Sequence, residues 1–349
     1  MLSYFSNQAL QVLFLYEMHL IINYYNQVYI DDWSRIMKSL KNTSLSIFTA
    51  NFFFLIIIIL LIIKDYLFNL IDFNNFYYNI LISEYGLYLI PIILYLIFNG
   101  FNLKHILRLN KLSFKQIIII SLIAICVACI STFLNTIIPA ILSLFGSFPR
   151  ISQQIPSPNS INQLITLLFF VALTPAICEE TLFRGLIMRC YEQLGGKAAI
   201  MASGILFGIF HFSVNIQGLL GLSFMGIILA YLVFKTNSIF ASMLAHFVYN
   251  SFGNTLRYFA NSSTDTTVQI INSKVAITTL LSSAIFAIPA AILCFILLRL
   301  LTKSTINDTY INNIEQRKNY IKSNIVRYAP LLPIILLYIY SCIRPFLWQ

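Results

Sequence analysis

The chain has 349 residues, of which 59% are hydrophobic and 10% are charged, and its mean hydropathy is +0.82. Soluble domains carry about 25% charged residues, so an ordinary soluble enzyme, a disordered scaffold and a secreted disulfide domain are excluded. The unbroken apolar run at 52–63 argues against a transmembrane β-barrel, whose strands alternate apolar and polar residues. The net charge of +10 would suggest nucleic acid in a soluble chain, but in a membrane protein Lys and Arg report topology. We therefore predict an integral, multi-pass membrane protein that binds the lipid bilayer and no nucleic acid.

Apolar stretches follow one another along the chain and predict an all-α, polytopic transmembrane helical bundle. About nine spans are expected, near 46–63, 83–100, 117–142, 161–178, 198–213, 217–234, 238–256, 275–299 and 328–347. Residues 8–30 are a weaker tenth candidate, whose polar side chains leave open whether it crosses the membrane or lies in the interface. The only linker-like segment, rich in Ser, Pro and Gln, is 143–160.

The distribution of basic residues predicts which side each loop faces. If the segment before 46–63 is inside and the spans alternate, 17 of the 22 Lys and Arg residues fall in inner loops and helix ends. This asymmetry is what the positive-inside rule requires. It places the 64–82 loop outside and the 101–116 loop inside. The basic run at 104–115 is interpreted as a topology determinant and a contact for lipid headgroups.

Three groups of polar residues lie in the apolar spans. An ionisable side chain at bilayer depth costs about 2.5–3.5 kcal/mol on insertion scales and marks a function by default. The groups are Glu179, Glu180 and Arg184, then His211, then His246 and Asn250.

Helical spacing predicts how these residues are arranged. Residues four apart share a face, so Glu180 is expected to pair with Arg184. Glu179 points about 100° away from Glu180, which leaves its carboxylate to face a cavity and act as a base. With a turn at Gly195, Glu179 and His211 each lie 16 residues from it, or about 24 Å at 1.5 Å per residue. This matching depth is what convergence of the groups on one intramembrane pocket requires.

The three motifs resemble those of a known family. Glu-Glu-x-x-x-Arg (179–184), Phe-x-x-x-His (207–211) and His-x-x-x-Asn (246–250) are similar to the motifs of the CAAX protease and bacteriocin-processing (CPBP, or Abi) family. Each motif alone is weak, but the three in this order, at the end of span four and on spans five and seven, are specific. The resemblance covers roughly 161–260, which corresponds to spans four to seven. It divides the chain into N-terminal membrane helices and loops (1–160), this catalytic core (161–260) and C-terminal membrane helices (261–349).

The resemblance implies an intramembrane metalloprotease of the CAAX type that hydrolyses a membrane peptide or protein substrate. By it, Glu179 would be the general base that activates water, and Glu180 with Arg184 would shape its environment. His211 and His246 would position the water or bind a metal, and Asn250 would stabilise the tetrahedral oxyanion. Two His and one Glu can form a catalytic zinc site, so His211, His246 and Glu179 are candidate zinc ligands. A metal-free glutamate–histidine site around a water is consistent with the same residues.

Two other functions could use the same residues. A non-catalytic immunity or regulatory membrane protein built on the same core is the main alternative, and the intact motifs disfavour it. A proton- or ion-coupled transporter would also place Glu and His in the membrane, but the sequence shows no matching broken helices in two related halves. Abundant Asn and Ile indicate an AT-rich genome, so a bacterial cell membrane is expected.

Overall fold

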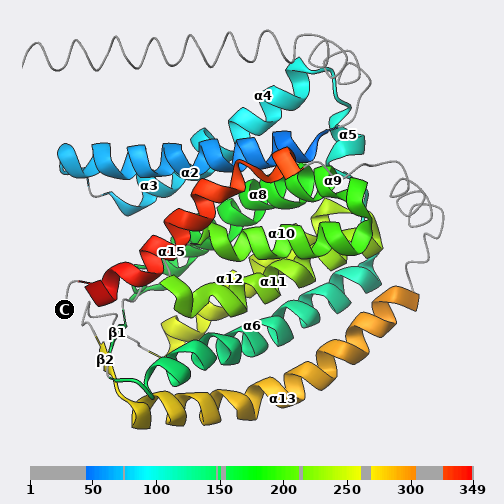
Figure 1. The fold of residues 1–349 in the computed structure, drawn as a ribbon. Helices are drawn as coiled ribbons and strands as arrows, with labels where there is room; N and C mark the ends of the chain where they lie inside the picture. Colours follow the sequence, from blue (N-terminus) through cyan, green and yellow to red (C-terminus); the bar gives the residue numbers. More distant parts are fainter. Residues whose placement is uncertain are drawn as a thin grey trace, which may run out of the picture. The chain divides into compact units, whose positions relative to one another are not determined.

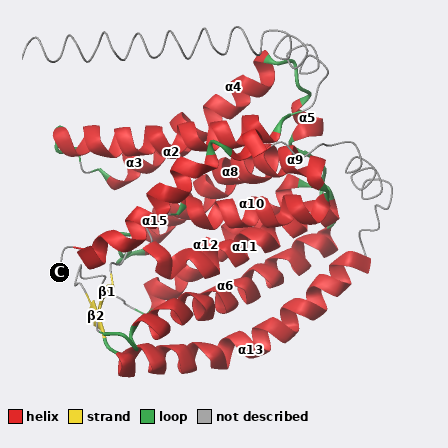
Figure 2. Ribbon diagram, in the orientation of Figure 1, coloured by secondary structure: helices red, strands yellow, loops and turns green. Residues whose placement is uncertain are grey.

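The computed structural model describes residues 45–73, 75–146, 148–150, 155–211, 215–260, 269–303 and 325–347. The weak candidate span at 8–30 lies outside the described residues. Figure 2 shows helices through almost all of the described part. The prediction of an all-α transmembrane bundle is confirmed, with one short pair of strands in addition.

The first two helical rods form a hairpin. Helix α2 (Ile47–Leu70) begins at Ser46, whose hydroxyl accepts a hydrogen bond from the Thr49 amide at 3.0 Å, as an N-cap does. The returning rod consists of three segments in sequence: α3 (Phe76–Leu81), the π-helical η1 (Ile82–Leu89) and α4 (Ile90–Phe98).

Much of the predicted 64–82 loop is therefore helical. Lys64 lies inside α2, and its side chain is only 10% exposed. It donates to Ser83 on the facing rod at 2.7 Å and also to Asn79. Because these hydrogen bonds compensate the charge of the Lys64 ammonium group, helix α2 continues past Lys64.

The next segments lead to α6 and to a short pair of strands. A short helix, α5 (Leu103–Ile106), occupies part of the predicted inner loop, and α6 (Phe114–Leu142) begins with a capping box between Ser113 and Gln116. Strand β1 (Phe148–Arg150) pairs antiparallel with β2 (Gln269–Ile271), a pairing that the sequence analysis did not predict. Strands of three residues carry no readable periodicity, and their partners lie far apart in the chain. Helix α13 (Ser273–Lys303) then packs along α6 (Figure 1).

The fourth rod carries the first motif and is irregular. Its segments are α7 (Ile161–Leu167), π-helical η2 (Leu168–Leu173), α8 (Thr174–Glu180), π-helical η3 (Thr181–Ile187), α9 (Met188–Tyr191) and the 3₁₀ turn η4 (Glu192–Leu194). The chain turns at Gly195, where φ is 97°, a conformation that glycine adopts readily. The depths of Glu179 and His211 in the bundle are counted from this turn.

Three neighbouring helices complete the core. They are α10 (Gly196–Phe210), α11 (Asn215–Thr236) and α12 (Ile239–Phe259). Helices α11 and α12 pack against α6, α10 packs against α11, and α13 lies on the other side of α6 (Figure 1). The chain continues into η7 (Ile325–Tyr328) and α15 (Leu331–Leu347). Asn51 on α2 fixes η7 by donating to the Arg327 carbonyl at 2.9 Å, and it accepts a hydrogen bond from the Tyr191 hydroxyl at 2.8 Å.

Each of the nine predicted spans coincides with a helical segment, but not all of these segments are both long and apolar enough to cross a membrane. In the described part of the chain, six helices are long and apolar enough to cross a membrane. Helix α10 and the apolar part of α15 are shorter, and α12 has the length but not the apolar character. The count of nine crossings therefore stays a prediction. Large apolar side chains of α13 such as Ile285, Phe286 and Ile288 are more than half exposed, as lipid-facing side chains are, and the chain is an integral membrane protein.

Candidate active site

A cavity of about 620 Å³ lies in the core among η1, η2, α8, α10, α11 and α12. Four of the six predicted site residues line it: Glu179, His211, His246 and Asn250. The other two, Glu180 and Arg184, lie behind its wall with fully buried side chains. The three motifs therefore converge, as their common depth in the bundle required.

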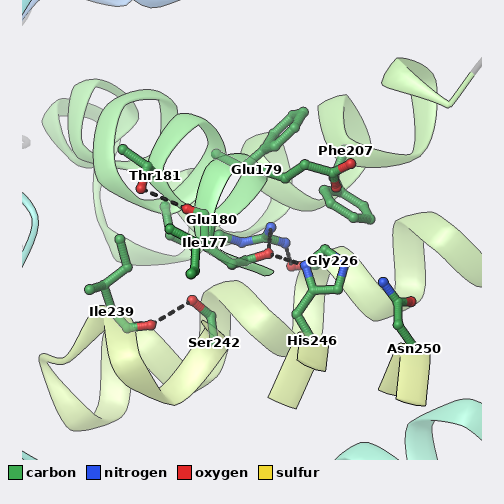
Figure 3. A network of polar contacts seen from close by, with 12 residues as sticks. Ile177, Glu179, Glu180, Thr181, Phe207, Gly226, Ile239, Ser242, His246 and Asn250 are labelled. Carbon is green, nitrogen blue, oxygen red and sulfur yellow. Dashed lines mark hydrogen bonds and ion pairs between the residues drawn. The ribbon is translucent and has the colours of Figure 1, made fainter. Parts of the chain in front are cut away.

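Glu180 is the centre of a buried polar network (Figure 3). Its Oε1 accepts from Arg184 Nη1 at 2.8 Å, which is the predicted i, i+4 pair, and from His246 Nδ1 at 2.8 Å. Arg184 Nη2 also donates to the Gly226 carbonyl on α11 at 2.7 Å. The guanidinium thus ties the first-motif helix to α11, while the carboxylate fixes the imidazole on α12.

Glu179 projects from the same helix toward His211 instead. Its Oε2 is 3.8 Å from His211 Nε2, and it makes no hydrogen bond among the described residues. His211 follows the last residue of α10, and its Nδ1 is 2.9 Å from the Phe207 carbonyl. Since a carbonyl only accepts, Nδ1 is the donor, and in the neutral ring Nε2 carries the lone pair. The carboxylate oxygen and this nitrogen therefore face each other across a gap in the cavity.

His246 presents the same ring nitrogen to the cavity. A carboxylate only accepts, so its Nδ1 donates to Glu180, and in the neutral ring Nε2 is left as an acceptor. Phe207 packs against both imidazoles, with ring centroids 4.7 Å from His211 and 5.7 Å from His246. The Arg184 guanidinium lies 4.8 Å from the same ring. Phe207 thus sets the orientation of both histidines, which gives the phenylalanine of the second motif a structural role.

Asn250 lies one turn beyond His246 but does not bond to it. Its Nδ2 donates to the Val171 carbonyl on η2 at 3.0 Å. One of the two amide protons is therefore committed, and the other is available to a ligand in the cavity. The π-helical winding of η2 is of the kind that recurs at functional sites.

Glu84 is a further residue of this site, outside the three sequence motifs. This residue is on η1, its side chain is buried, and it lines the cavity. Its carboxyl lies near that of Glu179 and near the ammonium group of Lys64. Glu84 falls inside the predicted span 83–100, so the rule on intramembrane ionisable residues was a sufficient signal.

The predicted zinc site needs three converging ligands. Among the described residues, no group of three or more His, Cys, Asp or Glu side chains is arranged to hold a metal ion. The Nδ1 atoms of His246 and His211 are bonded to Glu180 and to the Phe207 carbonyl, so a metal would bind their Nε2 atoms. Zinc binding stays a prediction.

The part of the chain that carries this site is similar to one known protein family. The sequence model of a family described as type II CAAX prenyl endopeptidase Rce1-like matches residues 161–252. This segment is similar to that family. It begins with α7, ends within α12 and contains all six predicted site residues. The match confirms the resemblance to the CAAX protease family and supports protease activity in general. No curated protein and no solved structure matches the chain.

Proposed function

We propose that the protein is an intramembrane endopeptidase that hydrolyses a membrane-associated peptide or protein with water activated by Glu179. The observation that carries the proposal is the pair Glu179 Oε2 and His211 Nε2, 3.8 Å apart at a cavity wall. His211 is held on its far side by the hydrogen bond to the Phe207 carbonyl, and the Glu84 carboxyl lies near Glu179. Such positioning before the substrate arrives is what general-base catalysis needs.

The reaction follows from the chemistry of these groups. A water between Glu179 and His211 gives a proton to the Glu179 carboxylate as its oxygen attacks the peptide carbonyl carbon. The carbonyl oxygen becomes an oxyanion, and the second Asn250 amide proton is the donor proposed to stabilise it. When the C–N bond breaks, the proton on Glu179 passes to the leaving nitrogen. A new carboxylate and a new amine are the products.

His246 is proposed to position the substrate or the attacking water. Its Nε2 lines the cavity as an acceptor, and its ring cannot rotate without losing the hydrogen bond to Glu180. Glu180 and Arg184 are positioning residues in this scheme, because they act through His246 and not on the substrate. The arrangement resembles other sites in which a carboxylate orients a catalytic imidazole.

The cavity also indicates the side from which a substrate enters. Its lining extends from Glu179 to Phe76, Ile155 and Arg257, which lie at outer helix ends or loops in the predicted topology. Arg257 donates to the Ile155 carbonyl at 3.0 Å and so belongs to this end of the cavity. We propose that the substrate reaches the site from the outer side of the cell membrane, which we expect to be bacterial.

The variant Glu179→Gln tests the proposal. It preserves size and hydrogen bonding but cannot accept the proton of water, so turnover should fall about 10²–10⁴-fold. A substrate would first be found by comparing the peptides released from membranes with and without the protein. Asp72→Asn, the same chemical change at an exposed turn residue, is the matched control and should retain full activity.

Retained cleavage in a folded Glu179→Gln protein would overturn the mechanism. If instead no cleavage is found for the wild type, and a cellular phenotype survives in Glu179→Gln, His211→Ala and His246→Ala, the immunity or regulatory alternative is favoured. In an active enzyme the three single losses should not add, because groups that act on one water fail as a unit.

A further inference from the structure

Asn135 is a polar residue of the active-site cavity that lies outside the segment matched by the family, 161–252. It belongs to the second half of the apolar helix α6. Helix α6 packs against α11 and against α12, which carries His246 and Asn250. A carboxamide in apolar surroundings is costly unless it is hydrogen-bonded, so the contacts of Asn135 indicate what it does.

The oxygen of the Asn135 carboxamide is fixed on α11. Oδ1 accepts a hydrogen bond from the Gly221 amide at 3.0 Å. One turn earlier on α6, the buried Ser131 hydroxyl donates to the Gly221 carbonyl at 3.1 Å. A Cβ at Gly221 would overlap the Asn135 side chain and would lie 2.6 Å from the Ser131 carbonyl oxygen. Only glycine therefore lets the two helices approach closely enough for these bonds.

This bond decides which part of the carboxamide is offered to the cavity. Because a backbone N–H only donates, the atom that faces Gly221 is the oxygen of Asn135. The NH₂ group, with its two donors, lies on the other side of the planar carboxamide. Asn135 can therefore present a neutral hydrogen-bond donor to a molecule in the cavity without losing its bond to α11.

Asn135 and Asn250 stand at the same depth in the bundle. Helices α11 and α12 are joined by a turn just after Thr236. Gly221 lies 15 residues before Thr236 and Asn250 lies 14 residues after it, which is about 21–22 Å along each helix at 1.5 Å per residue. Since Asn135 is bonded to Gly221, its carboxamide is level with that of Asn250, the proposed donor to the oxyanion.

We propose that Asn135 is a substrate-binding residue, whose Nδ2 donates to a main-chain carbonyl of the peptide beside the scissile bond. This role rests on the proposed peptidase function. Each substrate residue brings a carbonyl into the cavity, and a carbonyl removed from water without a donor costs free energy. The ionised Glu179 carboxylate only accepts, and Asn250 is assigned to the scissile carbonyl. Asn135 supplies a further donor at the same level, for the neighbouring carbonyl.

Kinetics with a synthetic peptide that spans the cleavage site, identified from the peptides released in membranes, test this role. Asn135→Leu removes the donor and the bond to Gly221, whereas Asn135→Asp keeps an acceptor for the Gly221 amide but has no N–H. Both should raise KM about ten-fold with kcat nearly unchanged, because a bond to a non-reacting carbonyl is equally strong in the ground and transition states. Ser131→Ala is the matched control. It removes the neighbouring bond between α6 and α11 but lies outside the cavity lining, and it should keep the wild-type KM.

Ester analogues of the peptide identify the carbonyl that is bound. An ester carbonyl is a weaker acceptor than an amide carbonyl, so the peptide bonds on either side of the scissile bond are replaced by esters in turn. One of the two esters should raise KM more for the wild type than for Asn135→Leu, which has already lost the hydrogen bond. If each ester raises KM equally in the two proteins, the proposed bond does not exist.

The outcomes for Asn135 are distinct from those for the proposed function. If the wild type cleaves and Glu179→Gln does not, the peptidase function stands. Wild-type KM values in both Asn135 variants would then overturn only the role of Asn135. An equal rise of KM in Ser131→Ala would also overturn it, because the effect would come from the contact between helices. If the wild type and Glu179→Gln release the same peptides, both proposals are wrong.

Discussion

Arg184→Ala should destabilise the whole bundle, and the structure sets the size of the effect. The substitution removes the 2.8 Å ion pair with Glu180 and the 2.7 Å hydrogen bond to the Gly226 carbonyl. Both side chains of the ion pair are fully buried, and breaking such a pair typically costs about 3–5 kcal/mol. His246 still donates to Glu180 at 2.8 Å, so the lower end of this range is expected. With about 2–4 °C per kcal/mol, the unfolding temperature should fall by about 6–12 °C.

The assay is thermal unfolding of detergent-purified protein, with yield in the membrane as a second readout. Arg299→Ala removes an exposed arginine from α13 and should unfold like the wild type. Arg184→Lys keeps the charge but not the planar pair of donors, so it should fall between the two. In a double-mutant cycle with Glu180→Gln, the combined loss should be smaller than the sum of the single losses. An Arg184→Ala protein that unfolds at the wild-type temperature would refute the reasoning.

Three further predictions concern a close contact between helices, the surroundings of Glu179 and the accessibility of the active-site cavity. A Cβ at Gly204 on α10 would lie 2.5 Å from the backbone nitrogen of Ile227 on α11. Gly204→Val should therefore lower the free energy of unfolding by about 1–3 kcal/mol. Gly86 has open space around it, so Gly86→Ala should change the free energy of unfolding little. Glu84→Ala should lower turnover about 10–100-fold, because the Glu179 carboxyl loses a neighbouring polar side chain at the cavity wall. Glu84→Gln keeps a polar side chain of the same size and should recover most of the turnover, and equal losses in both variants would contradict a positioning role. Gly253 lines the active-site cavity, and a Cβ there would have no atom within 4 Å. In a Cys-free background, Gly253→Cys should react with an impermeant maleimide from outside intact cells. Labelling only from the inner side would show that the substrate enters from the inside instead.

The sequence by itself determined the features that depend on local chemistry. Apolar runs of bilayer length must form helices, because the backbone has no other partner in lipid, and every predicted span coincides with a helical segment. The Glu180–Arg184 pair also follows from spacing alone, since residues four apart meet on any helix. The shared depth of the motifs was readable because Gly195 marks a sharp turn between two rods. The family match over 161–252 rests on the same local patterns.

Only the tertiary structure decided which side chains meet across helices. His246 bonds to Glu180, 66 residues away, and Asn250 bonds to Val171, 79 residues away. Their spacing places His246 and Asn250 on the same face of one helix, but it does not identify the partner of either side chain. Glu84 reaches Glu179 because two rods lie against each other at one particular rotation. Such contacts depend on the packing angle and rotation of whole helices, and apolar runs of nearly uniform hydrophobicity do not encode that rotation in any local pattern.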